Sequence, residues 1–214
     1  MKTIQEMLQE LSQCIVTVSG EFRFRTNWNG GKVPQPDLDT FDPNVPFCIE
    51  NVGDVPASVQ YNTKNTNIRI SKNYKTWNDY TSGTEIELNP KDRVYIKSDL
   101  VADIFGAPRF IFNGDGARLR ARGNIASLIY GTGDEYTTKY TIAAQYCYKS
   151  MFYGCSSLNY IKALFTTTPS TTYTVNWVTG VAATGTFVKN RKATWTTTGD
   201  NGIPLGWTVV NDNA

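Results

Sequence analysis

The chain has 214 residues, and 21 Lys and Arg stand against 19 Asp and Glu, so its formal net charge is +2. This length can bury one large core or two small ones, and the near-neutral charge gives no electrostatic footprint for nucleic acid. The chain contains no His, which excludes Ser-His-Asp and Cys-His catalysis and His-ligated metal sites.

The composition predicts a mainly β protein. The 27 Thr, 12 Tyr and 5 Trp suit the half-buried surface of a sheet, and the 17 Gly suit turns. No apolar run approaches the roughly 18 residues of a membrane-spanning helix, so we expect no membrane span. Glu6 and Glu10 interrupt what would be the apolar part of a secretory signal. We therefore expect the chain to stay in the cytoplasm in which it is made.

Residues 1–18 carry the one long helical pattern. Apolar side chains recur at the spacing of a single helical face, and most of them fit the core positions of a heptad. Because a helix of this length is marginal alone, something must cover this face: the chain's own β domain, a sister subunit of a dimer or trimer, or another partner. We predict oligomerisation or anchoring through Ile4, Met7, Leu8, Leu11, Ile15 and Val18.

A strand at 21–25 and a proline-rich arm at 26–47 follow. Four prolines in the arm prevent both helix and central strand, so we expect it to be extended. Asp37, Asp39 and Asp42 invite comparison with a calcium loop, but the Gly hinge and the closing Glu are missing. We interpret these carboxylates as solvated turn residues and expect no metal and no other cofactor.

Short alternating segments separated by turn signals occupy residues 47–122, as is typical of an immunoglobulin-like β-sandwich. In the last segment, Arg118, Arg120 and Arg122 share one strand face. They could form a nucleic-acid patch, but no second basic cluster supports one, and we interpret them as an exposed face charged for solubility. The seven predicted strands are 47–52, 58–61, 67–71, 84–88, 93–98, 110–113 and 117–122.

The sequence changes in character at Gly123. Residues 147–165, CYKSMFYGCSSLNYIKALF, have the apolar pattern of a helix-turn-strand unit with a buried Cys, as in one repeat of a solenoid. One unit cannot bury both its faces, so neighbouring segments must cap it. The cysteines Cys14, Cys48, Cys147 and Cys155 form no CxxC pair. We expect them to be reduced and to pack as small hydrophobes, and a Cys147–Cys155 disulfide is the less favoured alternative.

These patterns predict three domains: 1–46, an N-terminal helix, strand and attachment arm; 47–122, the β-sandwich; and 123–214, a single leucine-rich-repeat-like unit with a β cap. Four segments resemble the BspA-type leucine-rich-repeat proteins of Bacteroidetes and of their phages. They are GNIASLIYG (123–131), residues 147–165, NWVTGVAATGTFVKN (176–190) and GIPLGWTVV (202–210). Residues 70–98 are similar to the β domain that precedes the repeats in that family.

The resemblance implies a non-enzymatic structural protein, and the single repeat and the missing export signal favour the phage version. Head-fibre or capsid-decorating proteins of crAss-like phages are the nearest comparison. Such a protein is made in the host cytoplasm and resides in the virion. It attaches by its N-terminus to the capsid or other virion proteins and displays β domains that could contact a host glycan through Tyr and Trp. The alternative is a Bacteroidetes cell-surface adhesin. A carbohydrate-active enzyme is a weaker alternative, because no carboxylate pair stands in a recognisable constellation.

Overall fold

The computed structural model describes residues 42–100, 108–131, 145–167 and 169–212. The chain divides into two compact units, Met1–Lys32 and Val33–Ala214, and every described residue belongs to the second. The predicted N-terminal helix and its six anchoring residues lie outside the described residues, so their role stays a prediction. None of the described helices is long and apolar enough to cross a membrane.

The described residues are mainly β, as the composition predicted. A long sheet contains β1 (Phe47–Asn51), β3 (Thr66–Ser71), β4 (Asn78–Asp79), β6 (Arg93–Asp99), β8 (Leu119–Arg122), β9 (Leu158–Ala163), β10 (Thr186–Lys189) and β11 (Thr208–Asn211). A short sheet contains β2 (Ala57–Asn62), β5 (Glu85–Leu88) and β7 (Arg109–Asn113), and α2 (Ser127–Tyr130) is a single helical turn. The strand orders are β11-β10-β9-β8-β1-β6-β3-β4 and β5-β2-β7.

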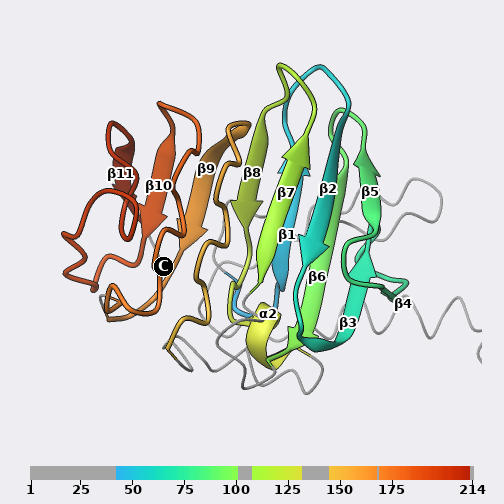
Figure 1. Ribbon diagram of the computed structural model, residues 1–214, viewed down its shortest axis with the longest axis horizontal. Coiled ribbons are helices and arrows are strands. Elements are labelled where there is room, and N and C mark those ends of the chain that lie inside the picture. Colours follow the sequence, from blue (N-terminus) through green and yellow to red (C-terminus); the bar gives the residue numbers. More distant parts are fainter. Residues whose placement is uncertain (1–41, 101–107, 132–144, 168, 213–214) are drawn as a thin grey trace, which may run out of the picture. The chain divides into compact units, whose positions relative to one another are not determined.

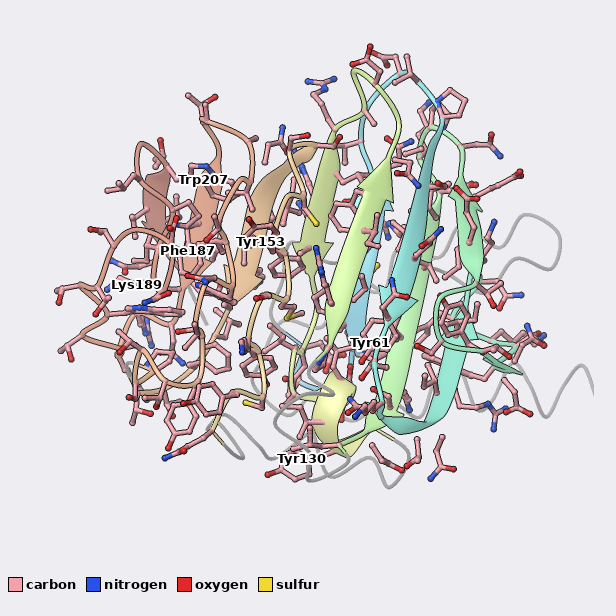
Figure 2. All side chains as sticks on the ribbon, viewed as in Figure 1. Tyr61, Tyr130, Tyr153, Phe187, Lys189 and Trp207 are labelled. Atoms are coloured by element: carbon pink, nitrogen blue, oxygen red, sulfur yellow. The ribbon has the colours of Figure 1, made fainter. Side chains whose placement is uncertain are left out.

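The two sheets form two layers over the first part of the chain, with β2 and β7 in front of β1 and β6 in Figure 1. All strand pairs of this part are antiparallel. Alternate residues of each strand point into the space between the layers, where the rings of Phe47 and Phe110 lie 5.3 Å apart. Tyr61, labelled in Figure 2, stacks on Phe110 at 4.9 Å. The seven predicted strands coincide with β1, β2, β3, β5, β6, β7 and β8.

The second part of the long sheet is a parallel ladder of β8, β9, β10 and β11. Arg120 pairs with Tyr160, Tyr160 with Thr186 and Thr186 with Thr208, so successive strands are offset by 40, 26 and 22 residues. The sequence pattern indicated a single strand-bearing unit at 147–165. β10 and β11 lie in the segments expected to form the β cap, and they continue the ladder as two further parallel strands.

Residues 145–154 form successive turns, and the helix predicted at the start of the 147–165 unit is wrong. Ser150 and Gly154 have φ angles of 54° and 77°, in the left-handed region that a right-handed α-helix excludes. Their backbone groups bond to the next turn of the chain, 25 residues later, instead of to residues four positions away. These bonds, each 2.8 Å long, run from the N–H groups of Ser150, Phe152 and Gly154 to the carbonyl oxygens of Val175, Trp177 and Thr179.

The antiparallel and parallel parts share one hydrophobic core. Phe152 stacks on Phe110 at 5.7 Å and lies 6.1 Å from Trp177. Trp177 in turn stacks on Trp195, whose ring meets Phe187 edge-on (labelled in Figure 2). The predicted domain boundary between residues 122 and 123 therefore falls inside one continuous sheet and one continuous core.

Candidate functional site

One face of the long sheet points away from this core and carries most of its charge. Because side chains alternate between the faces of a strand, the residues between the core positions all point outward. The strand registers align them in two rows. We call the two rows together the outer face, which is turned away from the viewer in Figure 1. The first row is Arg93, Glu50, Arg120, Tyr160, Thr186 and Thr208, and the second is Tyr95, Cys48, Arg122, Lys162, Val188 and Val210.

Glu50 on β1 joins arginines from both neighbouring strands. Its carboxylate accepts a hydrogen bond from Arg93 Nε at 2.9 Å and lies 2.7 Å from Arg93 Nη2. Arg122 Nε approaches the other carboxylate oxygen at 3.5 Å. Glu50 is 8% exposed and Arg122 is 4% exposed, so this charge cluster is removed from bulk water. Low local polarity strengthens the attraction within the cluster and raises the cost of losing a member.

We predicted that the arginines of segment 117–122 form an exposed face that is charged for solubility, and the structure differs from this prediction at one of them. Arg118 fits that description, since its side chain is 58% exposed and lies 3.9 Å from Asp54. Arg122 does not, because β1 places Glu50 beside it and the pair is buried. The prediction is wrong for this residue because the partner of Arg122 lies 72 residues away in the sequence.

Tyr160 is the aromatic centre of the outer face. The guanidinium groups of Arg120 and Arg122 lie 5.3 and 4.7 Å from its ring centroid, within the range of cation–π attraction. On the same strand, Lys162 Nζ lies 3.3 Å from a carboxylate oxygen of Asp212, just beyond β11. The outer face thus combines four cationic side chains with the carboxylates of Glu50 and Asp212 and with the rings of Tyr95 and Tyr160.

The thiol groups of the described residues are unsuited to nucleophilic chemistry. Burial raises the pKa of the Cys48 thiol far above its usual value, and burial raises the pKa of Cys155 to about 12. Both thiols are therefore protonated at neutral pH, and it is the thiolate that reacts. Cys48, Cys147 and Cys155 are buried in the hydrophobic clusters, which confirms the prediction that they pack as small hydrophobes. Within the described ranges no cluster of three or more Cys, Asp or Glu could hold a metal ion.

An open groove of about 590 Å³ lies at the Glu50 and Arg93 end of the outer face. Lys91 at its rim has a φ of 73°, a left-handed conformation that is uncommon outside Gly, Asn and Asp. Three cationic and two acidic side chains line the groove, so it can contact the carboxylate and hydroxyl groups of a polar ligand. The lining residues are Glu50, Asn51, Val52, Lys72, Lys91, Asp92 and Arg93.

The sequence reasoning named no ligand-binding residue, and the outer face is what it missed. Only the alternation of Arg120 and Arg122 was visible locally; Glu50 and Tyr160 join them through strand pairing. Comparisons of the chain with family models, with curated proteins and with solved structures find no significant match.

Proposed function

We propose that the chain is a non-enzymatic structural protein of a bacteriophage particle, a head-fibre or capsid-decorating protein. Its N-terminal region attaches it to the capsid or to another virion protein, and its β unit is displayed. In this proposal the antiparallel layers are an immunoglobulin-like sandwich, and the parallel ladder is a single leucine-rich-repeat-like unit of the BspA type with its β cap.

The observation that carries the proposal is the parallel ladder joined to the antiparallel layers in one sheet. Two of its three strand offsets, 26 residues from β9 to β10 and 22 from β10 to β11, lie within the roughly 20–29 residues of leucine-rich repeats, whereas Arg120 of β8 and Tyr160 of β9 are 40 residues apart. Three of the four segments that resemble the BspA type, 147–165, 176–190 and 202–210, contain β9, β10 and β11 of this ladder. A β body with a continuous aromatic core also suits a displayed part that has to stay folded outside a cell.

A cell-surface adhesin is the second candidate, and the groove beside Glu50 favours it. Three cationic side chains in an open recess suit weak contacts with the hydroxyl and carboxylate groups of a surface glycan. Catalysis on such a glycan is not part of either proposal. Glycosidases use two cooperating carboxylates, whereas Glu50, the buried carboxylate of this face, is engaged by two arginines.

Particle incorporation of the full chain tests the proposal. We expect the wild-type chain to sediment with purified virions and a Leu8→Asp/Leu11→Asp variant to be absent from them, with its melting temperature unchanged. A Val55→Asp/Leu205→Asp variant is the matched control, since these side chains are exposed at 37% and 72%, and it should still be incorporated.

Two results would contradict the proposal. Recovery of the chain on the surface of uninfected bacteria favours the adhesin. A lower melting temperature of the Leu8→Asp/Leu11→Asp variant, with incorporation retained, assigns the N-terminal helix to the chain's own core. Light scattering on the same samples determines whether the chain is a dimer or a trimer.

A further inference from the structure

The strand β11 is an exposed edge of the long sheet. In the order of the described strands it has β10 on one side and no described strand on the other, and it lies at the left end of the sheet in Figure 1. All four of its residues are exposed, and Val209 and Val210 are 45% and 42% exposed. An exposed apolar strand at a sheet edge is a template for pairing with another strand.

The other described edges are protected against such pairing. At the far end of the long sheet, β4 has two residues, and its Asp79 lies 3.1 Å from Arg69. In the short sheet, β5 presents the exposed Glu85 and Glu87, and β7 presents the exposed Arg109. Charged side chains and short strands hinder edge-to-edge contact. The sequence of β11, TVVN, contains neither a charge nor a proline, so this edge is the open one among those described.

Backbone groups of β11 define what can pair with it. The N–H groups of Thr208 and Asp212 donate to carbonyl oxygens of the β10 segment at 2.9 and 2.8 Å. Because residues of a strand turn their N–H and C=O groups to alternate sides, Val209 and Asn211 direct theirs toward the free edge. Only another extended backbone offers donors and acceptors at this spacing.

A second copy of β11 fits this edge when it is rotated about a two-fold axis beside Val210. In this antiparallel register, Val209 of each copy faces Asn211 of the other, and the two pairs exchange four hydrogen bonds. Val210 faces its own counterpart at the closer, non-hydrogen-bonded position, with the Cα atoms about 4.5 Å apart. Since Val188 is the neighbour of Val210 on β10, the valines of both copies form one apolar patch. The same surface serves both copies, as a two-fold interface requires.

The charges around β11 are compatible with this pairing. In the row of Val210, the first charged residue is Lys162 on β9. The Lys162 residues of two paired copies are five strand spacings apart, or about 24 Å, well beyond the Debye length of about 8 Å at physiological salt. Thr208 of each copy faces Asp212 of the other, so its hydroxyl group can donate to that carboxylate. No like charges are brought together.

We infer that β11 pairs with β11 of a second copy, antiparallel and about a two-fold axis, so that the two long sheets become continuous. The inference goes beyond the proposed function and holds for a virion protein or an adhesin alike. The contact is small, so the dimer is weak in solution. Attachment of both copies to one particle or surface raises their effective concentration and strengthens it.

Sedimentation equilibrium of the full chain tests the inference. All samples carry Leu8→Asp/Leu11→Asp, which removes association through the predicted N-terminal helix. We expect a monomer–dimer equilibrium with a dissociation constant below about 1 mM. Val210→Lys should raise this constant at least about tenfold, because two ammonium groups then face each other. An equal mixture of Val210→Lys and Val210→Glu should dimerise again. The matched control is Leu205→Lys, at a 72% exposed position outside the strand, which should keep the original constant.

Disulfide formation tests the register. In a Cys14→Ser background, whose other native thiols are buried, Val210→Cys should give a covalent dimer on mild oxidation, because the two Cα atoms are within disulfide range. Thr208→Cys, on the same strand face, should not, since its two copies are about 13 Å apart along the strands.

Three results would overturn the inference. The first is a dimer that survives Val210→Lys, and the second is equal crosslinking of Val210→Cys and Thr208→Cys. The third is a chain that stays monomeric up to about 1 mM. If its β11 amides were then protected from hydrogen exchange only in virions, the edge would belong to a strand of another virion protein.

Discussion

Glu50 is the acidic member of a cluster to which three adjacent strands contribute, with Arg93 on β6 and Arg122 on β8 as its partners. The two partners differ in environment, because the Arg93 side chain is 26% exposed and that of Arg122 is 5% exposed. Such a cluster adds little stability relative to apolar packing, but the removal of one member leaves an uncompensated buried charge. The negative charge of Glu50 therefore compensates the positive charges of both arginines at positions that are shielded from water.

We expect Glu50→Gln to lower the free energy of unfolding by about 1–3 kcal/mol. This is less than the 3–5 kcal/mol typical of a fully buried pair, because water screens part of the Arg93 interaction. Urea denaturation of the full chain measures the loss. Asp54→Asn is the matched control, since this carboxylate is 99% exposed and lies 3.9 Å from Arg118. Its unfolding midpoint should stay at the wild-type value, and equal losses in both variants would refute a special role for Glu50.

At the scale of elements, the turn after β8 packs tightly against the chain that leads into β1. Gly123 has a φ of 72°, and a Cβ atom added there would lie 2.1 Å from the Pro46 carbonyl oxygen. The next residue, Asn124, forms a bridge with Pro46. The chain just before β1 and the chain just after β8 thus approach so closely that a side chain at residue 123 has no room.

This close approach predicts a difference between two glycines of equal φ. Gly116 also has a φ of 72°, but an added Cβ there meets nothing within 4 Å. Alanine at either position lowers the free energy of unfolding by roughly 1–2 kcal/mol, because it has to adopt a left-handed conformation. We expect Gly123→Ala to lower the free energy of unfolding by about 1–3 kcal/mol more than Gly116→Ala, because the added methyl group also forces the backbone segments apart. Thermal denaturation of the two variants gives the comparison, and similar melting temperatures would show that the Pro46 contact relaxes without cost.

At the scale of the whole molecule, the described residues share one long sheet and one core, although their two parts differ in strand direction. Phe152, from the turns of the parallel part, stacks on Phe110 of the short sheet and contacts Trp177. Ring contacts of this kind couple the two parts, because either part alone would expose an aromatic face. We therefore expect the two parts to unfold together.

Phe152→Ala tests this coupling. The substitution should lower the stability of β6 and of β10 together, by about 3–5 kcal/mol, when denaturant midpoints are followed strand by strand with pulsed hydrogen exchange. Tyr153→Ala is the adjacent control, since Tyr153 is 46% exposed and should change stability by about 0.5 kcal/mol or less. Separate midpoints for β6 and β10 in the wild type would instead support two domains divided near residue 122.

The sequence by itself determined the mainly β class and the positions of seven of the first eight strands, all but the two-residue β4. Alternation of apolar and polar residues is a local property of a strand, and it is visible in any segment that has one buried face. The helix expected at the start of 147–165 failed for a related reason. Apolar residues three or four positions apart also fit a run of turns, whose N–H groups bond to the next turn, 25 residues later.

The tertiary structure decided which residues of different strands lie side by side, and no local sequence pattern contains this information. Glu50 lies beside Arg122, and Tyr160 beside both Arg120 and Arg122, because β8 stands between an antiparallel neighbour and a parallel one. The same strand order continues the long sheet from the antiparallel strands into the parallel ladder of β8, β9, β10 and β11. Strand order depends on contacts between residues far apart in the chain, and periodicity within a single segment carries no information about them.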